Sequence, residues 1–403
     1  MEQQSLPSSS LTARRQTSVK RKQNRVIDLI MKRSIGAISS IEYKRRTIIN
    51  EINYVAYAVN KTSLPVMYIN PNGRSTRNFV IDDILGMEVN PTESSCLLVT
   101  SRYNSVAIYN VSPDVITFNQ IKRMTIPHDP IDINGTPNSV HWLWDGTVFS
   151  VCTLDSVHFW DSCSCKIMET VKMPIRVLNH VIAAKKYSAK KYVAVAAIDG
   201  HVFMIDMLRG IVVMTMKNVE NRPITTIQWH PTNELQYITG NDNGNILLWD
   251  LRFQNNFVLK YNDDDSFSKT TSHPNPVIGL RFYNNGNSII SVDNMGGIRT
   301  WEVSTGNMRP NYYEPVTLCR LNKSQIFKDF QFAVTENLKE DIAFMPSDRG
   351  MKIFDIESGE HLPHSDDIPL PVNCATYDTH RFCVYGGSND LVKLWAPARK
   401  IYV

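Results

Sequence analysis

Long apolar runs and helical periodicity are both scarce in this 403-residue sequence, and each absence excludes a class of protein. The longest apolar run, Tyr192 to Ile198, is far shorter than the ~18 residues that a membrane-spanning helix needs. The first ten residues, MEQQSLPSSS, lack the apolar core of a secretory signal. We therefore expect a soluble, intracellular protein without membrane partners. After residue 50, no segment longer than about a dozen residues has a helical period, so we expect an all-β fold.

Motifs for catalysis are also missing. The sequence has no P-loop, no Gly-rich dinucleotide fingerprint after a strand, no His-Glu-x-x-His and no nucleophile elbow. The ten histidines are scattered, and His128, His230 and His273 each adjoin a proline, which is typical of turn residues. We therefore expect a protein that is not an enzyme and that requires no cofactor.

Cysteine is the third scarce feature, with seven residues, an odd number. Cys163-Ser-Cys165 has the form of half a metal site, but no second Cys or His pair stands at a usable spacing. We expect these two cysteines to form a turn and to hold no metal. The other five lie inside or beside apolar strand patterns and are expected to be small core residues: Cys96, Cys152, Cys319, Cys374 and Cys383.

What the sequence does contain is a repeat, best seen in the stretch Gln236 to Arg252, QYITGNDNGNILLWDLR. Two apolar strands flank a polar turn, and Asn243-Gly244 suits a tight hairpin because both residues tolerate positive φ. A single hairpin cannot bury its apolar face, so this unit needs neighbours on which to stack.

Such neighbours are present. Seven strand ends share the form of two apolar residues followed by an aromatic residue or Ile and then by Asp, Asn, Glu or Ala: Tyr109-Asn110, Trp160-Asp161, Ile205-Asp206, Trp249-Asp250, Trp301-Glu302, Phe354-Asp355 and Trp395-Ala396. Their separations, roughly 41 to 53 residues, match the ~40–45-residue period of WD repeats with loop insertions. The pattern predicts a seven-bladed WD-repeat β-propeller over residues 35–403.

The turn carboxylates of the repeats and a strand that precedes the first repeat are expected to be structural. Six ends are preceded by a carboxylate in the turn between the second and third strands of the blade, where it can bind backbone N–H groups: Asp155, Asp199, Asp242, Asp293, Asp348 and Asp390, with Asn104 at the first end. A strand from residues 35–60 is expected to close the last blade, because a circular propeller otherwise leaves its first and last blades unlocked. The path of residues 60–82 is left open.

The charge of the chain is unevenly distributed. Residues 1–50 contain eleven Lys and Arg against three acidic residues, a balance of +8, so the rest of the chain carries −4 of the +4 total. Residues 1–34 are predicted to form a basic, partly helical arm, in which Val26, Ile27, Ile30 and Met31 make a narrow apolar stripe that must dock on the propeller or on a partner. The cluster Lys20-Arg21-Lys22 with Arg25 fits a solvated helix face, a nuclear-import or acidic-partner contact, or phosphate binding.

Several segments together resemble the Cockayne syndrome group A protein family over most of the chain. They are the basic arm with Arg14-Arg15, Arg25 and Val26-Ile27; the segment Thr271 to Phe282, TSHPNPVIGLRF; the segment Met351 to Glu360, MKIFDIESGE; and the terminal Gly387 to Pro397, GSNDLVKLWAP.

The resemblance implies a function. Members of that family are nuclear, non-catalytic substrate receptors that dock on the large subunit of the damaged-DNA-binding adaptor of cullin-4 RING ubiquitin ligases. They act in transcription-coupled nucleotide excision repair, with the Cockayne syndrome group B translocase and RNA polymerase II as clients. The docking motif, W-D-x-R, stands once here, at Trp249-Asp250-Leu251-Arg252.

The resemblance also implies which residues bind the adaptor. Arg252 would be presented at the rim, where its planar fork suits carbonyl or carboxylate partners; a salt bridge within the propeller is the other interpretation. Trp249 and Asp250 would be more structural. The arm would insert into the adaptor, with Arg14, Arg15 and Arg25 beside the apolar stripe of Val26, Ile27, Ile30 and Met31.

Two other functions remain open. One is a general WD-repeat scaffold in a nuclear chromatin or RNA-processing complex, which needs no cullin adaptor. The other is a nucleic-acid-binding factor that uses the basic arm, although direct nucleic-acid binding is the less favoured interpretation. The affinity of such a factor for nucleic acid would fall steeply with added salt.

Overall fold

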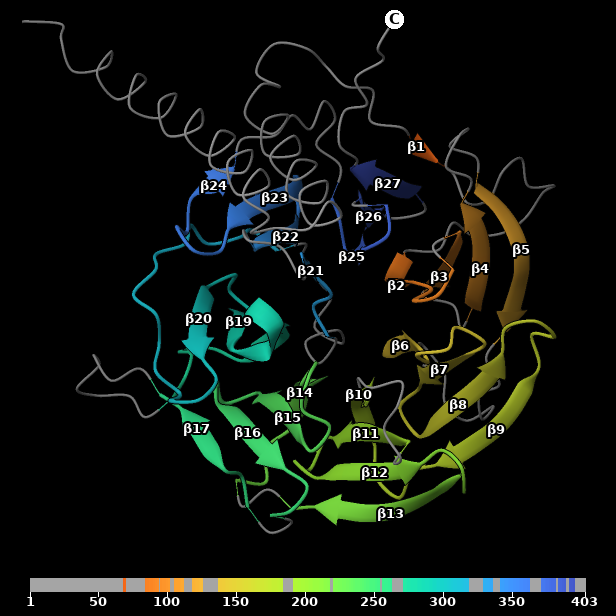
Figure 1. Ribbon diagram of the computed structural model, residues 1–403, viewed down its shortest axis with the longest axis horizontal. Helices are drawn as coiled ribbons and strands as arrows, with labels where there is room; N and C mark the ends of the chain where they lie inside the picture. The colour runs from red at the N-terminus through yellow and green to blue at the C-terminus, as the bar shows by residue number, and fades with distance from the viewer. Residues whose placement is uncertain are drawn as a thin grey trace, which may run out of the picture.

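The computed structural model describes residues 68–69, 84–93, 95–101, 105–111, 118–125, 137–183, 191–217, 220–253, 256–262, 271–318, 329–335, 341–362, 371–381, 383–388 and 391–395. This part of the chain contains 27 strands and one short 3-10 turn, η1 (Asn284–Gly286). Within these ranges no helix has the length and apolar character required to cross a bilayer. The strands form seven antiparallel sheets set around a ring, so the fold is a seven-bladed β-propeller, as predicted (Figure 1).

We number the blades along the chain. Blade 1 contains β2 (Ile84–Val89), β3 (Cys96–Ser101), β4 (Ser105–Val111) and β5 (Phe118–Thr125). Blade 2 contains β6 (Ser139–Trp142), β7 (Val148–Cys152), β8 (Ser156–Asp161) and β9 (Ile167–Lys172). Blade 3 contains β10 (Val177–Ile182), β11 (Tyr192–Ala197), β12 (Val202–Asp206) and β13 (Ile211–Met216). Blade 4 contains β14 (Ile224–Trp229), β15 (Gln236–Asn241), β16 (Ile246–Asp250) and β17 (Leu259–Tyr261).

The remaining blades follow the same order. Blade 5 has β18 (Val277–Tyr283), β19 (Ser288–Asp293) and β20 (Ile298–Glu302). Blade 6 has β21 (Ala333–Val334), β22 (Ile342–Ser347), β23 (Gly350–Asp355) and β24 (His361–Leu362). Blade 7 has β25 (Cys374–Asp378), β26 (Cys383–Ser388) and β27 (Leu391–Trp395), with β1 (Tyr68–Ile69) beside β27. Each repeated strand end of the sequence lies on the third strand of a blade, which confirms the assignment of seven repeats.

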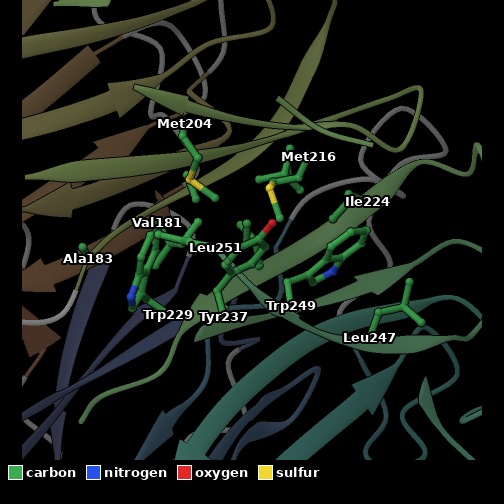
Figure 2. Packing of buried hydrophobic residues seen from close by; sticks show 14 residues of the cluster. Val181, Ala183, Met204, Met216, Ile224, Trp229, Tyr237, Leu247, Trp249 and Leu251 are labelled. Atoms are coloured by element: carbon green, nitrogen blue, oxygen red, sulfur yellow. The ribbon is translucent and has the colours of Figure 1, made fainter. Parts of the chain in front are cut away.

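The core lies between the blades. The described residues form seven apolar clusters, and each cluster joins two neighbouring blades. Figure 2 shows the cluster in which Met204 and Met216 of blade 3 pack with Tyr237 and Trp249 of blade 4. One of the seven joins blade 7 to blade 1, so the ring closes through apolar contacts as well as through strand pairing. Stacking therefore supplies the burial that one hairpin lacks.

The predicted source of the closing strand is wrong. The strand that pairs with β27 is β1, with Tyr68 opposite Lys393 and Ile69 opposite Val392. It comes from the 60–82 region, whose path the sequence left open, and the stretches expected within residues 35–60 lie outside the described residues. An N-terminal strand nevertheless completes the last blade, which is the physical requirement that motivated the prediction.

The turn after β15 also differs from the predicted tight hairpin. Four residues, Asp242 to Asn245, connect β15 with β16, and only Gly244 has a positive φ, of 83°. A Cβ at Gly244 would overlap the carbonyl oxygen of His273, so glycine is needed there for both conformation and space.

The segment before β21 crosses between opposite walls of the ring. Asp329 accepts a hydrogen bond from the Thr226 hydroxyl of blade 4 at 2.7 Å. Two residues later, Gln331 accepts from the backbone N–H of Met87 in blade 1 at 2.9 Å and donates to the Met87 carbonyl. The backbone N–H of Ala375 in blade 7 donates to the Gln331 carbonyl at 2.8 Å. The residues directly before the two-residue inner strand of blade 6 thus contact blades 1, 4 and 7.

Candidate functional site

The W-D-x-R segment ends the third strand of blade 4, and packing fixes its first residue. Trp249 is fully buried; its indole Nε1 donates to the Thr239 hydroxyl at 2.9 Å, and its ring stacks with Tyr237 at 6.1 Å between centroids. The predicted structural role of Trp249 fits this environment, because its burial and hydrogen bond are both internal to the blade.

Asp250 organises the turn that follows. Its side chain is 1% exposed; Oδ1 accepts from the backbone N–H of Arg252 at 3.0 Å and from Arg252 Nε at 2.9 Å. Its Oδ2 accepts from Arg252 Nη2 at 2.6 Å and from Gln236 Nε2 at 3.3 Å. The hydrogen bonds from Arg252 hold the pKa of the Asp250 carboxyl below its usual range, although burial alone would raise it. Asp250 therefore remains charged and buried.

Arg252 is held by this bidentate pair but stays open to solvent. The Arg252 side chain is 63% exposed, while Leu251 before it is buried. The salt bridge within the propeller, one of the two interpretations of Arg252, is thus present, and it leaves most of the side chain accessible. Such a pair adds little to stability at the surface, so its main effect is to fix the orientation of the guanidinium group.

The geometry at Arg252 is one case of a turn that several blades share. The terminal Asp of the third strand accepts the backbone N–H two residues later through its Oδ1: Cys163 on Asp161, Leu208 on Asp206, Arg252 on Asp250 and Glu357 on Asp355. These four presented residues are all exposed. In these four blades the terminal carboxylate is therefore a turn cap, and the residue two positions later is exposed. Only blade 4 offers an arginine among them.

The residues next to Arg252 were missed by sequence reasoning. Phe253 is 59% exposed and Val258 is 47% exposed, so apolar side chains follow the arginine in the same connection between β16 and β17. Phe253 directly follows the W-D-x-R motif, but the pattern does not reveal its exposure, because Leu251 and Phe257 on either side of it pack into the core. The predicted arm residues lie outside the described residues: Arg14, Arg15, Arg25, Val26, Ile27, Ile30 and Met31.

Blade 5 contains a buried polar network. His273 Nε2 lies 2.7 Å from the Ser291 hydroxyl, which also accepts from Trp301 Nε1 at 2.8 Å. The His273 Nδ1 atom is 3.5 Å from Asp293 Oδ2, and Oδ1 of Asp293 accepts the backbone N–H groups of Met295 and Gly297. The network ties together the third strand, the second strand and the loop before the first strand.

The hydrogen bonds of blades 4 and 5 test two predictions, one on the histidines beside prolines and one on the turn carboxylates. The expected turn role of His230 is confirmed, because its Nδ1 accepts the backbone N–H of Asn233 at 2.9 Å. His273 is more than a turn residue, since it is buried and hydrogen-bonded to a strand. The expected binding of backbone N–H groups by the turn carboxylates holds for Asp293 and for Asp199, whose Oδ1 accepts the N–H of His201 at 3.1 Å, but Asp242 does not have this role. In blade 4, Asn241 Oδ1 instead accepts the N–H groups of residues 243 and 245, in the position that Asp293 has in blade 5.

Buried Ser and His side chains are also in hydrogen-bond contact between blades 2 and 3, and no sequence motif predicted this contact. His180 Nε2 lies 2.7 Å from the Ser150 hydroxyl and its Nδ1 lies 2.5 Å from the Ser139 hydroxyl. Burial, followed by the nearby charge of His141, lowers the pKa of His180 well below its usual value. Ser150 and His180 are both inaccessible to solvent, so they can link strands but cannot contact a substrate in this structure.

Of the cysteines expected in the core, Cys96 is half-buried and three others are buried. Cys152, Cys374 and Cys383 are buried, and burial raises the pKa of Cys383 to about 12. Cys163 is exposed and Cys165 is buried, in the turn after β8. Across the described ranges, no three His, Cys, Asp or Glu side chains are grouped closely enough to hold a metal ion.

A comparison of the sequence with protein-family models finds no match.

Proposed function

We propose that this chain is a non-catalytic substrate receptor of a cullin-4 RING ubiquitin ligase that acts in transcription-coupled nucleotide excision repair. In this proposal Arg252 contacts the large subunit of the damaged-DNA-binding adaptor, and cullin 4 and the RING subunit join through it. The resemblance to the Cockayne syndrome group A family motivates the proposal. The observation that supports it best is the oriented, 63% exposed guanidinium at the end of blade 4.

The chemistry of Arg252 suits such a contact. Asp250 engages Nε and Nη2, so the described part of the chain leaves Nη1 available to an acceptor on a partner. Because Asp250 already restricts the side chain, binding costs less conformational entropy than for a free arginine. The exposed ring of Phe253 adds an apolar contact of the kind enriched in protein interfaces.

Arginine substitutions on two neighbouring blades test this proposal. Arg252→Ala and Arg252→Glu are expected to reduce binding of the purified adaptor subunit at least tenfold, without a change in thermal unfolding. Arg209→Glu is the matched control, because Arg209 is 72% exposed and pairs with the equivalent carboxylate, Asp206, at 3.8 Å. Unchanged adaptor binding in both Arg252 variants would remove Arg252 from the interface.

The arm is tested separately, by removal of residues 1–34 and mass spectrometry of the proteins that co-purify. Loss of the adaptor and cullin 4 on truncation is the expected result in a nuclear extract, together with recovery of the group B-type translocase and RNA polymerase II by the intact chain.

The second candidate is a general WD-repeat scaffold in a nuclear chromatin or RNA-processing complex. Exposed apolar side chains outside the Arg252 site favour it, namely Met168, Leu208, Ile211 and Val213 at the rim of blades 2 and 3. Recovery of an unrelated assembly without cullin 4 would move the function to this alternative.

A further inference from the structure

We propose that the outer strand of blade 3, β13, is a strand-addition site for an extended partner segment with alternating apolar residues and acidic residues at its ends. This site is distinct from the Arg252 turn and does not depend on the ligase proposal.

The first observation is the free edge. β13 pairs with β12 on one side and is the last strand of its sheet. Within the described ranges no main-chain hydrogen bond joins its other side to another segment. A six-residue edge with unpaired N–H and C=O groups is a template for another strand, and the main-chain bonds of an added strand would supply affinity whatever the partner's sequence.

The second observation is composition. β13 reads Ile-Val-Val-Met-Thr-Met and contains no charged residue. The other described outer strands of three or more residues each contain a charge: β5 has Lys122 and Arg123, β9 has Glu169 and Lys172, and β17 has Lys260. Charged side chains are the usual protection of an edge, and among these strands β13 alone lacks it.

The third observation is the exposed apolar surface around that edge. Ile211 is 51% exposed and Val213 is 39% exposed on the strand itself, and Leu208 in the preceding turn is 79% exposed. Met168 on β9 of the neighbouring blade is 64% exposed. The two blades are in contact here: Gly210 of blade 3 lies so close to Glu169 of blade 2 that a Cβ at Gly210 would overlap the Glu169 carboxylate. Exposed apolar side chains gathered at one place on a rim are typical of an interaction site.

The bulge in β13 explains why Val213 faces solvent. The pairing with β12 shifts between Met204 and Ile205, so Val213 is the additional residue on the outer strand. The side chains on either side of it, Val212 and Met214, pack into the clusters on opposite faces of the blade. Bulges can protect edges, but β9 has one as well, so the bulge is a feature of the blades and the absence of charge is what distinguishes β13.

The positive charges at both ends of β13 favour one kind of partner segment. Arg209 stands two residues before β13 and Lys217 directly follows it. Both side chains are exposed, and the long 3.8 Å pair of Arg209 with Asp206 leaves the Arg209 guanidinium 72% exposed. Two copies of β13 paired antiparallel would bring Arg209 of one copy beside Lys217 of the other, at both ends. Like charges so placed are destabilising, which disfavours a second copy. A partner segment with acidic residues at both ends of an apolar stretch is complementary instead.

The probe is a displayed library of random twelve-residue peptides, selected on the full-length purified chain. The test variant is Ile211→Lys with Val213→Lys, which places charges on the exposed positions of β13. The matched control is Met295→Lys, since Met295 is 70% exposed on blade 5, away from this edge. Thermal unfolding of both variants is measured first, and substitutions at exposed positions are expected to leave it within a few degrees.

Peptides enriched on the native chain are expected to alternate apolar residues between Asp or Glu ends. A synthetic copy of an enriched peptide should bind the test variant at least tenfold more weakly and the Met295→Lys control equally well. Replacing its acidic residues by Lys should also weaken binding at least tenfold, and bound peptide should slow hydrogen exchange at residues 211–216.

Three results would overturn the proposal. The first is equal recovery of peptides by the native chain and the test variant. The second is enrichment without acidic ends, which would leave Arg209 and Lys217 as protection against aggregation only. The third is a dimer in sedimentation equilibrium that the test variant dissolves, because the occupant would then be a second copy.

Discussion

Replacing Ser291 by alanine removes the hydroxyl on which the buried network of blade 5 depends. That oxygen accepts from Trp301 Nε1 at 2.8 Å, contacts His273 Nε2 at 2.7 Å and donates to the Arg299 carbonyl at 3.2 Å. Ser291 and Trp301 are fully buried and His273 is 1% exposed, so water cannot replace the lost partner without a rearrangement. An unsatisfied buried group costs about 1–3 kcal/mol. With two such groups and partial relaxation, we expect Ser291→Ala to lower the free energy of unfolding by about 2–4 kcal/mol.

Blade 4 provides a comparison of the same kind with fewer hydrogen bonds. There, Trp249 Nε1 donates to Thr239 at 2.9 Å, so Thr239→Val removes one acceptor and preserves the shape of the side chain. We expect a loss of about 1–2 kcal/mol, smaller than that of Ser291→Ala. Guanidinium unfolding followed by tryptophan fluorescence measures both, and Ser304→Ala on the exposed surface is the control. A Ser291→Ala midpoint equal to that of the control would refute the assignment of stability to this network.

Two further changes test buried polar groups. The pKa of Asp293 lies below its usual value. Burial raises this pKa, but the hydrogen bond and charge of His273 and the Gly297 N–H outweigh burial. The carboxylate therefore stabilises the fold above its unfolded pKa of about 4, and this contribution is lost as the pH falls through the folded pKa. Asp293→Asn should accordingly unfold at lower guanidinium than the native chain at pH 7, with a difference that shrinks below pH 4, and a pH-independent difference would contradict this. Gln331→Leu leaves the buried Met87 backbone groups without partners and should cost about 1–3 kcal/mol; an unchanged midpoint would show that the crossing segment does not brace the ring.

The repeat could be predicted from the sequence because each blade carries its own local pattern. Apolar strands separated by polar turns, ending at positions such as Trp249-Asp250 and Trp301-Glu302, recur at similar spacing. Since each blade buries its faces only against its neighbours, the recurrence itself requires a stacked arrangement. The number of blades and the third-strand position of every end followed from this.

The candidate site could be predicted only in part. The sequence located Arg252 after Trp249-Asp250, but the orientation of its guanidinium depends on Asp250, which the fold holds at 1% exposure. Phe253 could not be assigned to the surface from pattern alone, because apolar residues on either side of it, Leu251 and Phe257, pack into the core. The arm residues, including Arg14 and Val26, stay predictions.

Sequence by itself determined the fold class and the seven repeats, because these depend on short-range contacts that recur in a regular pattern. Tertiary structure alone decided which strand closes the ring, which side of the Asn241-Asp242 pair binds the turn, and how Gln331 reaches Met87. It also decided the exposure of Met168 and Val213, since a bulge shifts the register of each strand and turns outward a side chain that strict alternation would not single out. Contacts between residues hundreds of positions apart, and shifts of one residue within a pairing, leave no local trace in a single sequence.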